Sequence, residues 1–166
     1  MRGQRRPGRQ REALHGFSLV ELAVAIAVIS ALLFFLLDRV LYMQEVAEKT
    51  EVEETVRSIN FAIGLEAASR MARGADPKRL PLEKENPIKW LQSPPRHYLG
   101  EMEKPPAHAR PAYWYFHPGE RLFIYRPNRT EHLKIEGGGK ELRFIIRADG
   151  EQPHPRLLPT IPYAWF

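Results

Sequence analysis

The chain contains no cysteine, so its fold is maintained without disulfide bonds and it offers no thiolate ligand for a metal ion. Its six histidines show neither the His-x-His nor the His-x-x-x-His spacing of a metal site. The glycine run from Gly137 to Gly139 lacks the Lys-Ser/Thr pair and the helix of a phosphate-binding loop, and is predicted to be a turn. We therefore predict no catalytic residue, no bound metal, no cofactor and no enzymatic activity.

Proline is absent between Pro7 and Pro77, which leaves room for a long uninterrupted helix. Within this stretch, apolar residues recur at intervals of three and four, as they do on one face of an α-helix. These residues are Val52, Val56, Ile59, Ile63 and Ala67. Gly74 and the following Asp76-Pro77 form a helix stop signal. The pattern predicts one helix from about Phe17 to about Ala72, with the apolar stripe of its C-terminal half packed on a globular domain.

Charge is nearly absent from residues 17–37, where Glu21 is the one ionisable side chain. A helix of 21 residues is about 31 Å long, which matches the hydrocarbon thickness of a bilayer. The stretch is therefore predicted to be a single transmembrane span. An ionisable side chain at membrane depth costs roughly 2.5–3.5 kcal/mol, so Glu21 is expected to have a cationic partner.

Basic residues gather ahead of this stretch, because residues 1–16 contain five arginines against one glutamate. Lysine and arginine close to a span stay on the cytoplasmic side, so the N-terminus is expected in the cytoplasm and the chain after Leu37 outside it. Without residues 1–16, the chain carries 20 basic against 19 acidic residues. It then lacks the basic character of a nucleic-acid-binding protein, and no nucleic-acid partner is expected.

The residues around the start of the span carry a specific motif. A basic leader ends in Gly16 and is followed by Phe17-Ser18-Leu19-Val20-Glu21 and an unbroken apolar stretch. This arrangement resembles the type IV pilin and type II secretion pseudopilin family. The resemblance implies that a prepilin peptidase cuts between Gly16 and Phe17, removes residues 1–16, and leaves Phe17 as an N-methylated N-terminus. Two other interpretations stay open: a cleaved secretory signal, which has a shorter apolar region, and a plain single-span anchor.

Cleavage after Gly16 would create an ammonium group on Phe17, about one helical turn from Glu21. Together they predict an assembly salt bridge, within one subunit or between staggered neighbours, which would fix register more than it adds stability. The resemblance also implies a pilin-like α+β fold, with the long helix packed on an antiparallel sheet. The chain lacks the C-terminal cysteine pair of a typical major pilin. Asp38 stands where many major pilins have a helix-kinking proline.

The expected function is therefore that of a minor pseudopilin, a structural subunit of a type II secretion pseudopilus. The alternatives are a minor pilin of a type IV pilus and a membrane-tethered periplasmic binding module. The implied partners are other pilin or pseudopilin subunits, the prepilin peptidase, an inner-membrane assembly platform and membrane lipid. The implied location is the inner membrane, with the N-terminus cytoplasmic and the C-terminal domain periplasmic, and a filament after assembly.

The exported part divides into three predicted regions after the span. Residues 38–74 form the amphipathic half of the helix, which carries an acidic run at Glu45, Glu48, Glu51, Glu53 and Glu54. That run is interpreted either as a solvated helix face or as a contact with a basic patch on the next subunit. Residues 75–111 contain eight prolines and form a connecting loop with at most one short helix, near residues 88–92. Three residues are expected to pin this loop to the core: Trp90, Tyr98 and Leu99.

Residues 112–166 read as an antiparallel β-meander followed by a tail. The four predicted strands are residues 112–116, 121–126, 132–136 and 141–147, which pair as two hairpins. The tail from Gln152 is rich in proline and ends in an apolar cluster, so it either folds back on the domain or forms a binding edge.

Overall fold

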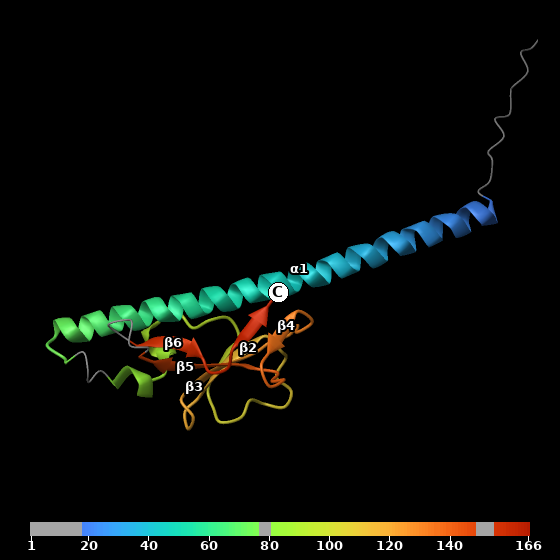
Figure 1. The fold of residues 1–166 in the computed structure, drawn as a ribbon. Coiled ribbons are helices and arrows are strands. Elements are labelled where there is room, and N and C mark those ends of the chain that lie inside the picture. The colour runs from blue at the N-terminus through green and yellow to red at the C-terminus, as the bar shows by residue number, and fades with distance from the viewer. Residues whose placement is uncertain (1–17, 77–80, 149–154) are drawn as a thin grey trace, which may run out of the picture. The chain divides into compact units, whose positions relative to one another are not determined.

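The computed structural model describes residues 18–76, 81–148 and 155–166 (Figure 1). The chain divides into two compact units, Met1–Leu41 and Tyr42–Phe166. The fold is α+β, with one long N-terminal helix and a mixed, mainly antiparallel sheet.

Helix α1 spans Leu19–Ala72 and crosses from the first unit into the second. Its N-terminal part is apolar from residue 19 to residue 37 apart from Glu21 and Ser30, and every residue from 19 to 40 except Ala25 is exposed. The helix is long and apolar enough to cross a membrane.

The C-terminal part of α1 lies along the sheet and contributes one side of the core (Figure 1). Val52, Ile59, Ile63 and Ala67 are buried, and Val56 packs at the edge of the same cluster. The predicted apolar stripe is thus confirmed. The predicted end is also confirmed, because Gly74 adopts a positive φ and the chain closes the helix with a bond from Ala75 N to Arg70 O at 3.0 Å.

The main sheet has five strands in the order β1-β2-β3-β5-β6. Strands β2, β3, β5 and β6 pair antiparallel, whereas β1 pairs parallel with β2. A separate two-stranded sheet joins β4 and β7. The strands are β1 Tyr98–Glu101, β2 Tyr113–His117, β3 Leu122–Arg126, β4 Leu133–Ile135, β5 Leu142–Arg147, β6 Arg156–Pro159 and β7 Tyr163–Trp165.

The first predicted hairpin is confirmed, because β2 pairs antiparallel with β3, but the second hairpin and the four-stranded meander are wrong. Four strands occur close to the expected positions, but β3 pairs directly with β5, and β4 leaves the main sheet to pair with β7. The tail folds back on the domain as β6 and β7, which was one of the two expected outcomes. Strand β4 has only three residues, so a tight β3-β4-β5 meander would leave the longer β5 without a full-length neighbour.

Both faces of the sheet are covered. Trp114 stacks on Phe123 with ring centroids 4.6 Å apart, on the face that meets α1. On the opposite face Tyr113, Tyr115 and Ile124 belong to a smaller cluster. Residues of the connecting loop, including Met102 and Ala109, pack on that cluster.

The connecting loop contains two 3₁₀ helices, η2 at Pro81–Lys84 and η3 at Pro87–Trp90, and the unpredicted strand β1. Buried Asn86 organises it, since its side chain accepts the N–H of Ile88 and donates to the Tyr98 hydroxyl at 2.8 Å and to Glu101 at 3.0 Å. Trp90 and Tyr98 pack on the core as predicted. Leu99 does not, because it is 38% exposed on the edge strand.

Candidate functional site

The start of α1 holds the predicted assembly residue Glu21, whereas Gly16 and Phe17, the predicted cleavage and methylation residues, lie outside the described part of the chain. The Glu21 carboxylate accepts the backbone N–H of Ser18 at 2.9 Å, and Ser18 Oγ accepts the N–H of Val20 at 3.3 Å. This reciprocal arrangement is a capping box, which satisfies free donors at the first turn of a helix.

The capping box gives Glu21 a second role besides the predicted salt bridge. A carboxylate in the first turn also interacts favourably with the positive end of the helix dipole. The sequence signal was present as Ser-x-x-Glu at residues 18–21, but the prediction for Glu21 considered its charge alone.

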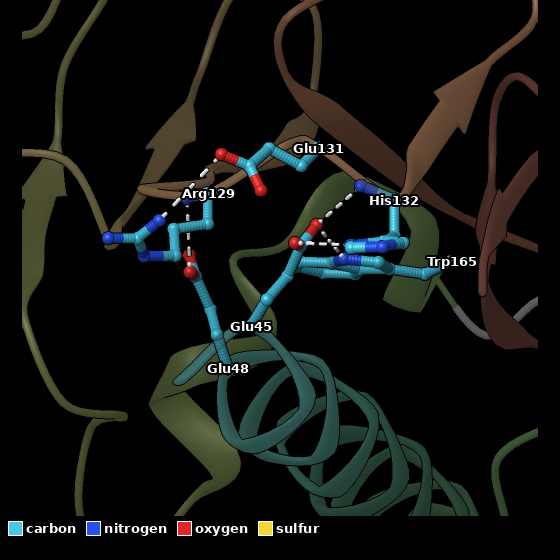
Figure 2. Close-up of polar contacts among 6 residues, drawn as sticks. All are labelled: Glu45, Glu48, Arg129, Glu131, His132 and Trp165. Carbon is cyan, nitrogen blue, oxygen red and sulfur yellow. Dashed lines mark hydrogen bonds and ion pairs between the residues drawn. The ribbon is translucent and has the colours of Figure 1, made fainter. Parts of the chain in front are cut away.

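A second group of charged side chains lies where α1 meets the β3–β4 loop and the C-terminal strand (Figure 2). We call it the Glu45 cluster, and it consists of Glu45, Glu48, Arg129, Glu131, His132 and Trp165. Glu45 and Glu48 stand one turn apart on α1 and point toward the loop (Figure 2). The cluster lies wholly within the second unit.

Glu45 is only 1% exposed and is the best-buried charged residue of the described chain. One of its oxygens accepts the backbone N–H of His132 at 2.9 Å and the indole N–H of Trp165 at 3.0 Å. Its other oxygen lies 2.9 Å from His132 Nδ1. A single carboxylate therefore fastens both the β3–β4 loop and strand β7 to the helix.

Glu48 also accepts hydrogen bonds from its own chain, in the preceding part of the β3–β4 loop. It accepts the hydroxyl of Tyr125 at 2.9 Å and the backbone N–H groups of Asn128 at 2.7 Å and Arg129 at 3.2 Å. Hydrogen bonds to charged acceptors are stronger than those between neutral groups, so these contacts define the loop conformation. The solvated-face interpretation of the acidic run is wrong for these two residues, which bind their own chain.

The electrostatics of Glu45 are set by two opposing effects. Burial by itself raises its pKa, but the hydrogen bonds from the His132 ring, the His132 N–H and the Trp165 indole, together with the charge of His132, lower the pKa below its ordinary value. Glu45 is therefore held as a carboxylate. The His132 ring is fixed from its other side, where it stacks on Phe166 with centroids 4.8 Å apart and meets the edge of Tyr42.

Glu45, Glu131 and His132 place three potential metal-ligand atoms within 4.8 Å of one another. The donor set does not favour a cation there, since both Glu45 oxygens already face N–H donors or the His132 ring. The Arg129 guanidinium also stands 4.0 Å from Glu131. These contacts indicate that the group is a structural anchor, and we assign no metal ion to these three residues.

A polar contact further along the helix anchors the tail. The Asn60 side chain accepts the backbone N–H of Leu157 at 2.7 Å and its amide group lies 3.4 Å from the Leu157 carbonyl oxygen. Because β6 is the edge strand of the main sheet, this side chain holds a strand that has a neighbour on one side only. The α1 helix thus organises the domain through polar as well as apolar contacts.

The chain was also compared with known proteins, and it matches no family model, no curated protein and no solved structure. The functional interpretation therefore depends on the residues of this chain and on the geometry described above.

Proposed function

We propose that this chain is a membrane-anchored structural subunit of the pilin and pseudopilin type, acting as a minor pseudopilin of a type II secretion pseudopilus. The observation that carries the proposal is the division of α1. Its first half is apolar, exposed and long enough to cross a membrane, and its second half is packed on an α+β domain. Such a subunit would use the first half for assembly and display the domain outside the membrane.

The start of the helix supports a processing step at its boundary. The described helix begins at Leu19 with Ser18 as its cap, two residues after the expected cut between Gly16 and Phe17. Cleavage there would add a positive ammonium group next to the positive end of the helix dipole, which is unfavourable. The Glu21 carboxylate, on its own chain or on a neighbour, would offset this charge.

Processing provides the direct test. Co-expression with a prepilin peptidase should shorten the chain by the sixteen residues that precede Phe17, as measured by intact mass. A Gly16→Arg variant is the control and should stay uncut, because a bulky charged residue replaces the glycine at the cut. A product that starts beyond Leu37 would identify a secretory signal and overturn the proposal.

A membrane-tethered binding module is the second candidate, and the capping box favours it. Glu21 already has a local partner in the Ser18 N–H, so its presence does not require a neighbouring subunit. Crosslinking in membranes separates the two candidates. A filament subunit should give crosslinks between neighbouring transmembrane halves when assembly proteins are present, and a tethered module should give none.

A further inference from the structure

The exported half of α1 carries a second apolar stripe that does not face its own core. Phe61 is 74% exposed and Leu65 is 64% exposed, although both lie in the part of the helix that packs on the sheet. Ala68 and Ala72 are also exposed. These four residues are spaced by four, three and four positions, which is the spacing of a coiled-coil seam.

The same spacing continues toward the N-terminus through Ser58, Glu54 and Glu51, all of which are exposed. The seam therefore has an acidic end and an apolar end. Arg57 lies 2.6 Å from Glu54 and neutralises it in part, whereas Glu51 forms no ion pair with any residue that the structure describes. The acidic end keeps a net negative charge.

The connecting loop forms a wall beside this seam. Trp90, Leu91, Pro94 and Pro95 stand opposite the helix and, with residues 51–65 of α1, line a groove of about 730 Å³. Trp90 and Leu91 are half-buried, so the wall is fixed to the core and remains accessible from the groove. A contiguous exposed apolar surface with a polar rim is typical of a protein-binding site.

We propose that this groove binds one amphipathic helix of a different protein, with apolar residues at coiled-coil spacing and Lys or Arg at the end beside Glu51 and Glu54. An amphipathic helix that lays its apolar face in such a groove is a common mode of recognition. The alanines at positions 68 and 72 let a partner helix approach closely, and Phe61 and Leu65 supply the apolar anchors.

The acidic end of the seam argues against a second copy of this chain as the occupant. A parallel copy in register places Glu51 and Glu54 beside their own counterparts, and like charges across an interface are unfavourable. If a parallel copy is shifted by seven residues, its Ser58 and Phe61 lie opposite Glu51 and Glu54. Neither carboxylate is then neutralised. An antiparallel copy is excluded only if the chains are anchored in one membrane, so this step rests on the proposed function.

The test uses the full chain in lipid nanodiscs and two fluorescent synthetic helical peptides. Both peptides have leucines at seam spacing; one carries lysines at the end that meets Glu51 and Glu54, and the other carries glutamates there. Leu65→Asp should weaken binding of the lysine peptide at least about tenfold, because it puts a charge in the apolar contact. Ile161→Asp is the matched control, since Ile161 is exposed outside the groove, and should leave binding unchanged.

A charge exchange then tests the acidic end. The double variant Glu51→Lys and Glu54→Lys should reverse the preference, so that the glutamate peptide binds more tightly than the lysine peptide. An unchanged preference or no binding of either peptide would overturn the proposal.

Self-association is tested separately, and the absence of native cysteine makes this simple. Ser58→Cys lies in the seam, so a copy docked there in parallel register would form a disulfide-linked dimer on oxidation, and this result would overturn the proposal. Peptide binding is measured on the unprocessed chain. A chain that binds the peptide but is never cut by the peptidase would refute the filament proposal and leave the groove assignment in place.

Discussion

The two halves of α1 form the same secondary structure for different physical reasons. From Leu19 to Leu37 the side chains are apolar apart from Glu21 and Ser30 and nearly all are exposed, so in water this half would gain nothing from packing. From Tyr42 on, apolar residues occupy one stripe that the sheet covers, and Glu45 and Glu48 add polar anchors. The first half therefore depends on an apolar surrounding, whereas the second depends on its own domain.

Truncating one isoleucine in each half, buried Ile63 and exposed Ile29, should give the largest difference in domain stability. Ile63→Ala should lower the free energy of unfolding of the domain by about 2–5 kcal/mol, because Ile63 is fully buried. Ile29→Ala should change it by no more than about 0.5 kcal/mol. All three tryptophans lie in the second unit, so urea denaturation followed by tryptophan fluorescence reports on that unit alone. Equal losses in the two variants would contradict the comparison.

The Glu45 cluster should produce the next largest effect. Glu45→Ala should cost about 3 kcal/mol of unfolding free energy, since the N–H of His132 and the Trp165 indole lose their acceptor in a buried place. Glu51→Ala is the matched control, an acid on the same helix with no ion pair among the described residues, and should cost no more than about 0.5 kcal/mol. Urea denaturation of both variants checks this, and a large loss for Glu51→Ala would mean that the acidic run acts as a whole.

Lowering the pH should reduce the free energy of unfolding of the domain, because the Glu45 carboxylate becomes protonated. The pKa of Glu45 in the fold is below its ordinary value of 4.5, which applies to the unfolded chain. Its contribution to stability is therefore fully present above pH 4.5 and is lost as the pH falls through the lowered pKa. The stability difference between the parent protein and Glu45→Gln should shrink in that acidic range. A difference that stays constant from pH 7 down to pH 3 would show that ionisation of Glu45 does not matter.

The smallest effect on stability is expected at the helix start, where three variants separate capping from charge. Ser18→Ala removes the cap and should raise amide hydrogen exchange in the first turn, at a cost of about 0.5–1 kcal/mol. Glu21→Gln keeps a capping-box side chain but removes the charge, and Glu21→Ala removes both. If Glu21 acts through an intersubunit salt bridge, both Glu21 variants should lose subunit crosslinks and Ser18→Ala should retain them. Loss of crosslinks in Ser18→Ala and Glu21→Ala, with crosslinks retained in Glu21→Gln, would assign the role to capping.

Much of the local structure could be predicted from the residues themselves. The lack of proline before Pro77, the stripe from Val52 to Ala67 and the stop at Gly74 are signals within a few helical turns, and they placed the helix to within two residues at its start. The glycine run at 137–139 was predicted as a turn, and Gly137 and Gly138 do adopt positive φ. The Ser18–Glu21 capping box is an equally local signal, although it was not among the sequence predictions.

What the sequence by itself determined is therefore the long helix, its apolar and amphipathic halves, and the approximate positions of the later strands. Only the tertiary structure decided that β3 pairs with β5 and β4 with β7, that β1 joins the sheet, and that Glu45 is a buried anchor. A helix depends on neighbours three and four residues away, so its pattern is local. Strand pairing and the burial of a charge depend on groups as distant as Glu45 and Trp165, 120 residues apart in the chain, and these contacts exist only after folding.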